Sequence, residues 1–240
     1  MIRRVLQKMS LAISAPLRYA VRYELKRWLK TDQNIRMALY RKATEATADY
    51  VDKHMRNVDS VSSRYDLLTN ALKTADLGGH KLVCEFGVHS GKSINYIASH
   101  TSGTVYGFDS FDGLPERWRD GFDQGLFKRS SWPNVRPNVK LIQGLFNETL
   151  PTFLQRHDGE ICFLHIDCVL YSSTRTILDL LRDRIKPGCV IVFDEYFNYP
   201  GWDQGDYKAF HEFLVQTALK YEYIGYNYLH EQAAVIIRSS

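Results

Sequence analysis

Short apolar runs alternate with amphipathic segments from residue 81 to the C-terminus. Seven runs have the length and the β-branched and aromatic content of strands: residues 81–86, 104–108, 139–143, 161–166, 189–193, 221–226 and 233–238. Helical spacing predicts helices at residues 93–99, 148–155, 173–183 and 207–219. Strands that are apolar throughout and separated by helices indicate an α/β fold with a parallel sheet covered on both faces. The last two strands have only a short link, so we expect them to form a hairpin and the last strand to be antiparallel.

Residues 1–80 have a different pattern, with apolar residues at three- and four-residue spacing and no glycine before Gly78. We therefore expect a helical N-terminal arm or cap over residues 1–80 and one sheet domain over residues 81–240. Residues 1–30 carry eight Lys or Arg side chains against the single acid Glu24. Such a segment could contact a membrane surface peripherally, and the favoured alternative is a helix that caps the domain or packs in a homo-oligomer.

Composition narrows the class of protein. The hydrophobic content of 45% supports a core, and 240 residues suit one large domain with an appendage. Residues 1–30 carry a net charge of +7 against +4 for the whole chain, so the other residues sum to −3, which argues against nucleic-acid binding. The four cysteines form no C-x-x-C pair, so we expect free thiols in the reducing cytoplasm. The short N-terminal apolar segment predicts neither a secretory signal nor a membrane span.

A glycine-containing turn follows the first predicted strand. The strand ends in Glu85, then come Gly87, Gly91 and Ser93, and the next strand closes on Asp109. Such a turn, with an acid on the next strand to bind ribose hydroxyls, is typical of a nucleotide site. His89 stands where a dinucleotide fingerprint has a second glycine, which disfavours a nicotinamide-dependent dehydrogenase. A carboxylate here suits the cationic end of S-adenosylmethionine, and the alternative is an ordinary strand-turn-helix connection.

Three acids follow two later strands: Asp167, Asp194 and Glu195. The carboxyl ends of parallel strands meet at one crevice, so these acids should converge. Three carboxylates need a cation, and oxygen ligands favour Mg²⁺, which can lower the pKa of a substrate hydroxyl. The alternative is that they cap helices or pair with Arg175 or Lys208.

Several blocks occur together in order: Glu85-Phe86-Gly87-Val88 with Gly91 and Ser93, Gly107-Phe108-Asp109-Ser110-Phe111-Asp112-Gly113-Leu114-Pro115, Gln143-Gly144-Leu145-Phe146, His165-Ile166-Asp167-Cys168, Leu170-Tyr171-Ser172-Ser173-Thr174 and Phe193-Asp194-Glu195-Tyr196. In these the chain resembles the macrocin-type sugar O-methyltransferases, from about residue 65 to 238. The resemblance implies a Rossmann-like class I methyltransferase fold, S-adenosylmethionine as donor, and usually Mg²⁺-assisted methylation of a hydroxyl on a sugar or glycosylated small molecule.

The resemblance also implies site residues. Glu85, Gly87, Gly91 and Ser93 would form the turn at the methionine end, Asp109 would hold the ribose, and Ser110, Gly144 and Phe146 would frame the adenine. Asp167, Asp194 and Glu195 would hold the ion that activates the acceptor, with Asp167 as the catalytic residue.

One position departs from the family pattern. Val169 stands where the family usually has a second acid, two residues after Asp167. If that acid binds the ion or takes the hydroxyl proton, this chain could be a catalytically weakened, methyltransferase-like binding protein. We expect Val169 to lie in a wet crevice, because the strand has ended at Asp167. Residues 110–138 form a long loop, as in functional lids, and His165 should be a core histidine with its polar atoms paired.

Overall fold

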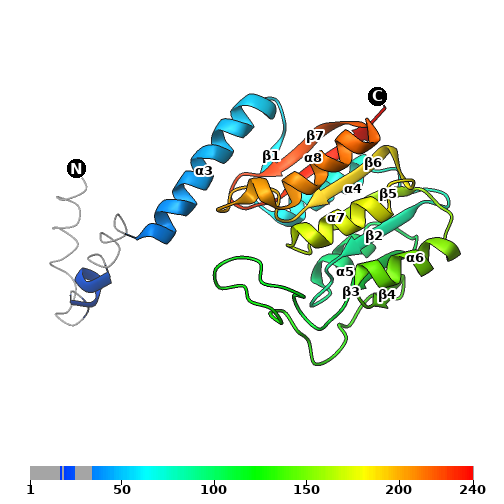
Figure 1. Cartoon of the computed structure of the whole chain (residues 1–240), viewed down its shortest axis with the longest axis horizontal. Helices are drawn as coiled ribbons and strands as arrows, with labels where there is room; N and C mark the ends of the chain where they lie inside the picture. The colour runs from blue at the N-terminus through cyan, green and yellow to red at the C-terminus, as the bar shows by residue number, and fades with distance from the viewer. Residues whose placement is uncertain (1–16, 18, 25–33, 240) are drawn as a thin grey trace.

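The computed structural model describes Leu17 and residues 19–24 and 34–239, and in this part of the chain one sheet is covered by helices on both faces (Figure 1). The strands are β1 (Ser60–Val61), β2 (Leu82–Phe86), β3 (Val105–Asp109), β4 (Val139–Gln143), β5 (Ile161–Ile166), β6 (Ile185–Phe193), β7 (Lys220–Asn227) and β8 (Ala233–Arg238). The helices are α3 (Ile35–His54), α4 (Arg64–Thr74), α5 (Lys92–Ala98), α6 (Phe146–Arg156), α7 (Tyr171–Leu180), the 3-10 turn η2 (Trp202–Gln204) and α8 (Asp206–Thr217).

The sheet order is β1-β7-β8-β6-β5-β2-β3-β4. All pairings are parallel except those of β8, which runs antiparallel to both β6 and β7. The predicted α/β class, the seven strands and the antiparallel last strand are confirmed. The sheet has an eighth strand that the sequence did not indicate: Ser60 and Val61, within the expected helical arm, pair with Tyr226 and Asn227 of β7.

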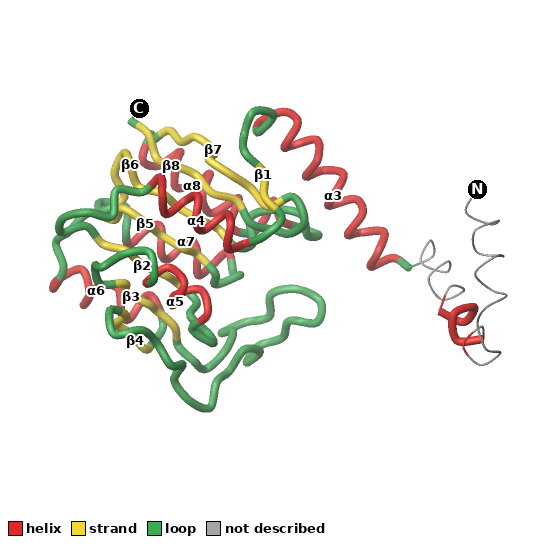
Figure 2. The backbone as a smooth tube through the Cα atoms, turned by 180° about the vertical axis from the view of Figure 1, so that it is seen from behind, coloured by secondary structure: helices red, strands yellow, loops and turns green. Residues whose placement is uncertain are grey.

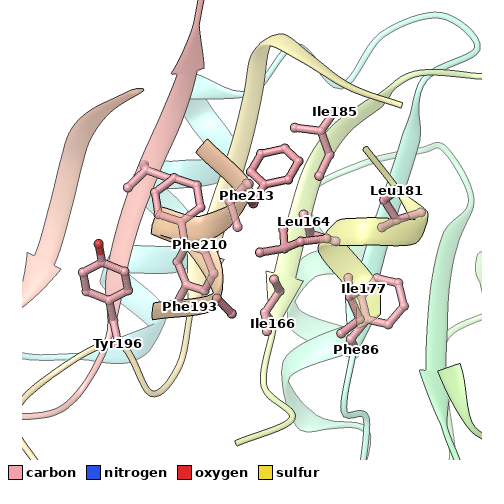
Figure 3. Close-up of a cluster of buried hydrophobic side chains, with 14 of the residues drawn as sticks. Phe86, Leu164, Ile166, Ile177, Leu181, Ile185, Phe193, Tyr196, Phe210 and Phe213 are labelled. Carbon is pink, nitrogen blue, oxygen red and sulfur yellow. The ribbon is translucent and has the colours of Figure 1, made fainter. Parts of the chain in front are cut away.

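Two hydrophobic clusters fill the space on either side of the sheet. On one face, apolar side chains of α6, α7 and α8 pack against the strands, and on the other face α4 and α5 do so. Figure 3 shows the first cluster, where Phe210 and Phe213 of α8 and Ile177 of α7 meet strand residues such as Ile166. Each strand at the centre of the sheet is therefore buried on both faces, as its apolar sequence predicts.

The helix α3 projects from the sheet domain (Figure 2) and touches it through an ion pair of Arg36 with Asp120 and through apolar residues of its later turns. The Tyr50 hydroxyl lies 2.6 Å from that of Tyr223 on β7, and Thr44 donates to Asn198 at 2.8 Å. Residues 60–75 are integral to the sheet domain, because β1 extends the sheet and α4 covers one face. Most of the basic segment of residues 1–30 lies outside the described residues, so its membrane and oligomer roles stay predictions.

Backbone hydrogen bonds continue past the ends of the central strands and hold their turns together. Gly87 N donates to Phe108 O at 2.9 Å, and Asp167 N donates to Phe86 O at 2.8 Å. Gly87 has φ +92°, and a Cβ there would collide with the carbonyl oxygen of Asp167. The carboxyl ends of β2 and β5 can approach this closely only because residue 87 has no side chain.

We expect Gly87→Ala to destabilise the protein by more than Gly188→Ala does. Gly188 also has positive φ, +96°, but nothing lies within 4 Å of a Cβ placed there. Gly188→Ala should cost about 1–2 kcal/mol of unfolding free energy for its left-handed backbone, and Gly87→Ala roughly 1–3 kcal/mol more for the collision. Urea denaturation of both variants measures the difference, and equal losses would show that the β2–β5 approach can relax.

Candidate functional site

A cavity of about 480 Å³ opens at the carboxyl ends of the central strands. Its floor comes from the turns after β2, β3, β4, β5 and β6, and its roof from the long loop between β3 and β4. In both views this loop extends beyond the carboxyl edge of the sheet (Figures 1 and 2). We call residues 110–138 the lid loop. The location is the one at which open α/β sheets bind ligands.

Five of the eight predicted cofactor residues line this cavity: Gly87, Asp109, Ser110, Gly144 and Phe146. The other three do not. Glu85 is fully buried beneath the cavity, Ser93 is buried in α5, and Gly91 faces Pro133 of the lid loop. The structure therefore brings together the predicted ribose and adenine residues, and only Gly87 from the predicted methionine turn.

Asp109 organises the turn after β2 with its own carboxylate. Its Oδ2 accepts hydrogen bonds from the backbone amides of Val88 and His89, both at 2.8 Å, and its Oδ1 accepts one from Phe111 N at 2.7 Å. The carboxylate still lines the cavity, and carboxylate oxygens can each accept more than one hydrogen bond. Asp109 can thus hold the turn and bind a ligand hydroxyl at once, and the sequence pattern indicated only the second role.

Glu85 pairs with His165 inside the sheet. The two residues are direct register partners on β2 and β5, and Nδ1 of His165 donates to Oε1 of Glu85 at 2.7 Å. Nε2 of His165 lies 3.8 Å from Asp194 Oδ1. Burial lowers the pKa of His165, but the carboxylates of Asp194 and Glu85 raise it more, to about 9. His165 is a core residue, as expected, but only its Nδ1 is paired, because Nε2 has no hydrogen-bond partner among the described residues. It lies between the buried Glu85 and the acid Asp194.

The acids after β5 and β6 do converge, but a protein cation lies between two of them. Nη2 of Arg64 is 2.8 Å from Asp167 Oδ2 and 2.9 Å from Asp194 Oδ1. Among the described residues, the ligand atoms that lie close enough to share an ion belong to His165, Asp167 and Asp194, without Glu195. Sequence reasoning missed Arg64, which begins α4 about a hundred residues before Asp167.

This arrangement separates the pKa values of the acids. Burial opposes ionisation of Asp194, but His165 and Arg64 hold its pKa below the usual range. Burial and the charge of Asp194 raise the pKa of Asp167, against the opposing effects of His165 and Arg64. Burial, with Asp167 and Asp194 nearby, raises the pKa of Glu195 well above its usual range. Neighbouring acids with pKa values pushed apart are typical of functional sites.

The expectation that Val169 lies in a wet crevice is wrong. Its exposure is only 6%, and it packs in an apolar cluster with Leu114, Leu170, Trp118 and Phe122. Val169 lines the cavity through this cluster and has φ +58°, a left-handed conformation that is rare for a β-branched residue. The lid loop, which supplies three of the four partners, excludes water from position 169.

Arg119 ties the lid loop to the sheet. Its guanidinium lies 3.7 Å from the ring centre of Trp118 and 4.8 Å from that of Tyr199, and it donates to both carboxylate oxygens of Glu231 in the β7–β8 turn at 3.1 and 3.3 Å. Because this pair is only about 20% exposed, water screens it weakly. This part of the lid loop is thus anchored beside the cavity that it lines.

Comparisons with known proteins were made on sequence and on structure. Residues 84–196, slightly less than half of the chain, match a family described as a methyltransferase domain. The fold is that of a methyltransferase. The calicheamicin methyltransferase CalS11 superposes with a TM-score of 0.55 at 22% identity, over 72% of this chain and 76% of that one. The O-methyltransferase NovP gives 0.55 at 21% identity, over 74% and 80%. No curated protein matches the sequence, and no helix among the described residues is long and apolar enough to cross a membrane.

Asp206, at the start of α8, is a buried acid outside the cavity lining. Its Oδ1 accepts a hydrogen bond from Thr174 at 2.6 Å, and Oδ2 has no partner in the part of the chain that the structure describes. Burial raises the pKa of Asp206 to about 8. In the unfolded chain an Asp carboxyl titrates near 4, so from about pH 4 to pH 8 only the folded state keeps this proton. Stability should therefore fall as pH rises through this window.

We expect Asp206→Asn to flatten that pH dependence, since Asn keeps an oxygen for Thr174 and has no proton to lose. Its free energy of unfolding should decline less steeply than that of the wild type between pH 5 and 7.5, by on the order of 1 kcal/mol per pH unit. Urea denaturation across this range measures both slopes, with the exposed acid Asp203→Asn as control. Parallel curves would show that Asp206 is ionised in the folded protein.

Val169→Asp should be less stable than Val169→Asn. Asp and Asn both tolerate a positive φ and have similar shapes, but only Asp would place a charge in the apolar cluster. We expect a difference of about 1–3 kcal/mol in unfolding free energy at pH 8. Equal stabilities by chemical denaturation would mean that the lid loop readily admits water to position 169.

Proposed function

We propose that this chain is an S-adenosylmethionine-dependent O-methyltransferase that acts on a hydroxyl of a sugar or glycosylated small molecule. The observation that carries the proposal is one cavity, at the carboxyl edge of a methyltransferase fold, with nucleotide-type residues at one end and acids at the other. A volume of about 480 Å³ lies within the range of small-molecule sites.

The half of the cavity beside β2, β3 and β4 suits the cofactor. Asp109 can accept from ribose hydroxyls, and Ser110, Gly144 and Phe146 surround the place for an adenine. Gly144 has φ +138°, which brings its backbone to the cavity without a side chain. When bound, S-adenosylmethionine would supply a methyl group on a positively charged sulfur.

The half beside β5 and β6 suits the acceptor. The carboxylate of Asp167 is 23% exposed and lines the cavity, and Arg64 holds its Oδ2. Its Oδ1 would take the proton of the acceptor hydroxyl as the hydroxyl oxygen attacks the methyl carbon and the carbon–sulfur bond breaks. The lid loop would exclude water that competes with the acceptor oxygen, with Trp118 and Phe122 over the cavity.

The neighbour CalS11 is described as a calicheamicin methyltransferase, and NovP is described as an O-methyltransferase. Together with the resemblance of the sequence blocks, they support an oxygen acceptor on a glycosylated compound. Aromatic rings of the lid loop offer apolar faces on which a sugar ring can stack.

Magnesium assistance, predicted from the three acids, meets an obstacle in this arrangement. An ion that bridged Asp167 and Asp194 would lie about 2.1 Å from each oxygen, in the place that Arg64 Nη2 now holds. The Glu195 carboxylate lies outside the group of candidate ligands. The site as it stands does not fit Mg²⁺, so proton removal is assigned to Asp167 alone.

A catalytically weakened binding protein is the second candidate, and the apolar burial of Val169 favours it. In that case the cavity would still hold S-adenosylmethionine, but no methyl group would reach an acceptor. The two candidates differ in turnover and share cofactor binding.

Calorimetry should show S-adenosylmethionine binding to the wild type at micromolar levels. Asp109→Asn should weaken binding by about 1–2 kcal/mol, or roughly 5- to 30-fold, because one oxygen acceptor is lost. Asp112→Asn, at an exposed position in the adjoining lid loop, is the matched control. Absence of binding to the wild type would overturn both candidates.

Methyl transfer is then measured with methyl-labelled cofactor and a panel of nucleotide sugars and glycosides. Transfer should fall about 100-fold or more in Asp167→Asn, with cofactor affinity retained. Cofactor binding without transfer to any acceptor in the panel would favour the binding protein.

A further inference from the structure

The guanidinium of Arg64 occupies the bridging point of the acidic cluster. A single nitrogen, Nη2, is within 3 Å of one oxygen from each of Asp167 and Asp194. These two acids directly follow neighbouring strands, β5 and β6, and Asp167 lines the cavity. A cation at that point neutralises both, and a guanidinium stays charged at every pH the protein meets.

Arg64 is held in this position by the fold. It is the first residue of α4, whose preceding residue Ser63 caps the helix by accepting from Tyr65 N at 3.2 Å. The helix then buries Leu67, Leu68, Ala71 and Leu72 against the sheet. Just before it, Val61 O accepts from Tyr228 N at 3.0 Å, which ties β1 to the end of β7.

The predicted set of three oxygen ligands is also incomplete here. Glu195, the third of them, does not share the cluster, and among the described residues its buried Oε2 has no partner. His165 takes its place in the cluster with a nitrogen, whereas Mg²⁺ prefers oxygen ligands. An ion that entered would have to displace Arg64 from both carboxylates and leave a guanidinium beside a divalent charge, which is electrostatically unfavourable.

We infer that Arg64 is the built-in cation of this site, that it excludes divalent ions, and that the chain binds its acceptor and turns over without them. Because Arg64 lines the cavity, its other N–H groups are available to the acceptor oxygen beside Asp167. The part about turnover rests on the proposed function, and the part about ion binding does not.

The test uses Mn²⁺ as a probe of the purified full chain without cofactor or acceptor. Electron paramagnetic resonance measures free Mn²⁺ during the titration. The wild type should show no saturable binding below about 1 mM, whereas Arg64→Ala should bind at least about tenfold more tightly, since two carboxylates are then left facing each other. Asp194→Asn in the Arg64→Ala background should abolish that gain.

Arg175→Ala is the matched control. Arg175 also bridges two acids, Asp179 at 2.8 Å and Glu212 at 2.9 Å, but on the surface of α7 away from the cavity. Removing it should create no comparable Mn²⁺ site, because solvated carboxylates hold the ion weakly. Arg64→Lys keeps the charge and should exclude Mn²⁺ as the wild type does, which leaves a test if Arg64→Ala does not fold.

Saturable Mn²⁺ binding to the wild type that Asp194→Asn removes would overturn the inference, as would a folded Arg64→Ala that binds no better than the wild type. If methyl transfer is found, a chelator should leave the wild-type rate unchanged, and added Mg²⁺ should raise the rate of Arg64→Ala alone. Loss of wild-type transfer on chelation, restored by Mg²⁺, would also overturn it. Because ion binding is measured without turnover, failure of the proposed function would leave that result standing.

Discussion

The chain of charges through the centre of the sheet is the constraint on which the rest of the site depends. Glu85 on β2 and His165 on β5 are fully buried, and an isolated charge at such a position would be costly. Each is tolerated because the next group compensates it: Glu85 is bonded to His165, which lies near Asp194, which pairs with Arg64. Removing any one member would leave a buried charge without its partner, so the sequence must keep them as a set.

This chain of charges also connects parts of the molecule that are remote in sequence. It begins on the second strand, passes through β5 and β6, and ends on the helix α4. The same three strands carry the Gly87 turn, Asp167 and Asp194 to one edge. The electrostatic requirement and the backbone hydrogen bonds past the strand ends therefore fix the same geometry, which explains how acids from separate strands come to share one cavity.

The central strands were predictable because each is a continuous apolar run. Such a run is typical of a strand that is buried on both faces of a sheet. The sequence did not indicate β1, because two residues are too few to show a periodic pattern. The predicted β6 was too short: the strand begins at Ile185, but Lys186, Pro187 and Gly188 interrupt its apolar pattern. The acids of the site were predictable because strands end at the ligand edge. Arg64 was not, since its contact with Asp167 depends on how α4 packs. The contact between Glu85 and His165 could have been predicted, because aligning the two predicted strands side by side makes these residues neighbours.

The two backbone amides that Asp109 holds have a thermodynamic consequence. Because the carboxylate already orders the turn after β2, that turn has little conformational entropy left to lose when a ligand arrives. A nucleoside would meet a preorganised surface, and its hydroxyls would join hydrogen bonds that exist before it binds. Such a site gains affinity because little ordering entropy is lost on binding, and association is not slowed by a rearrangement of this turn.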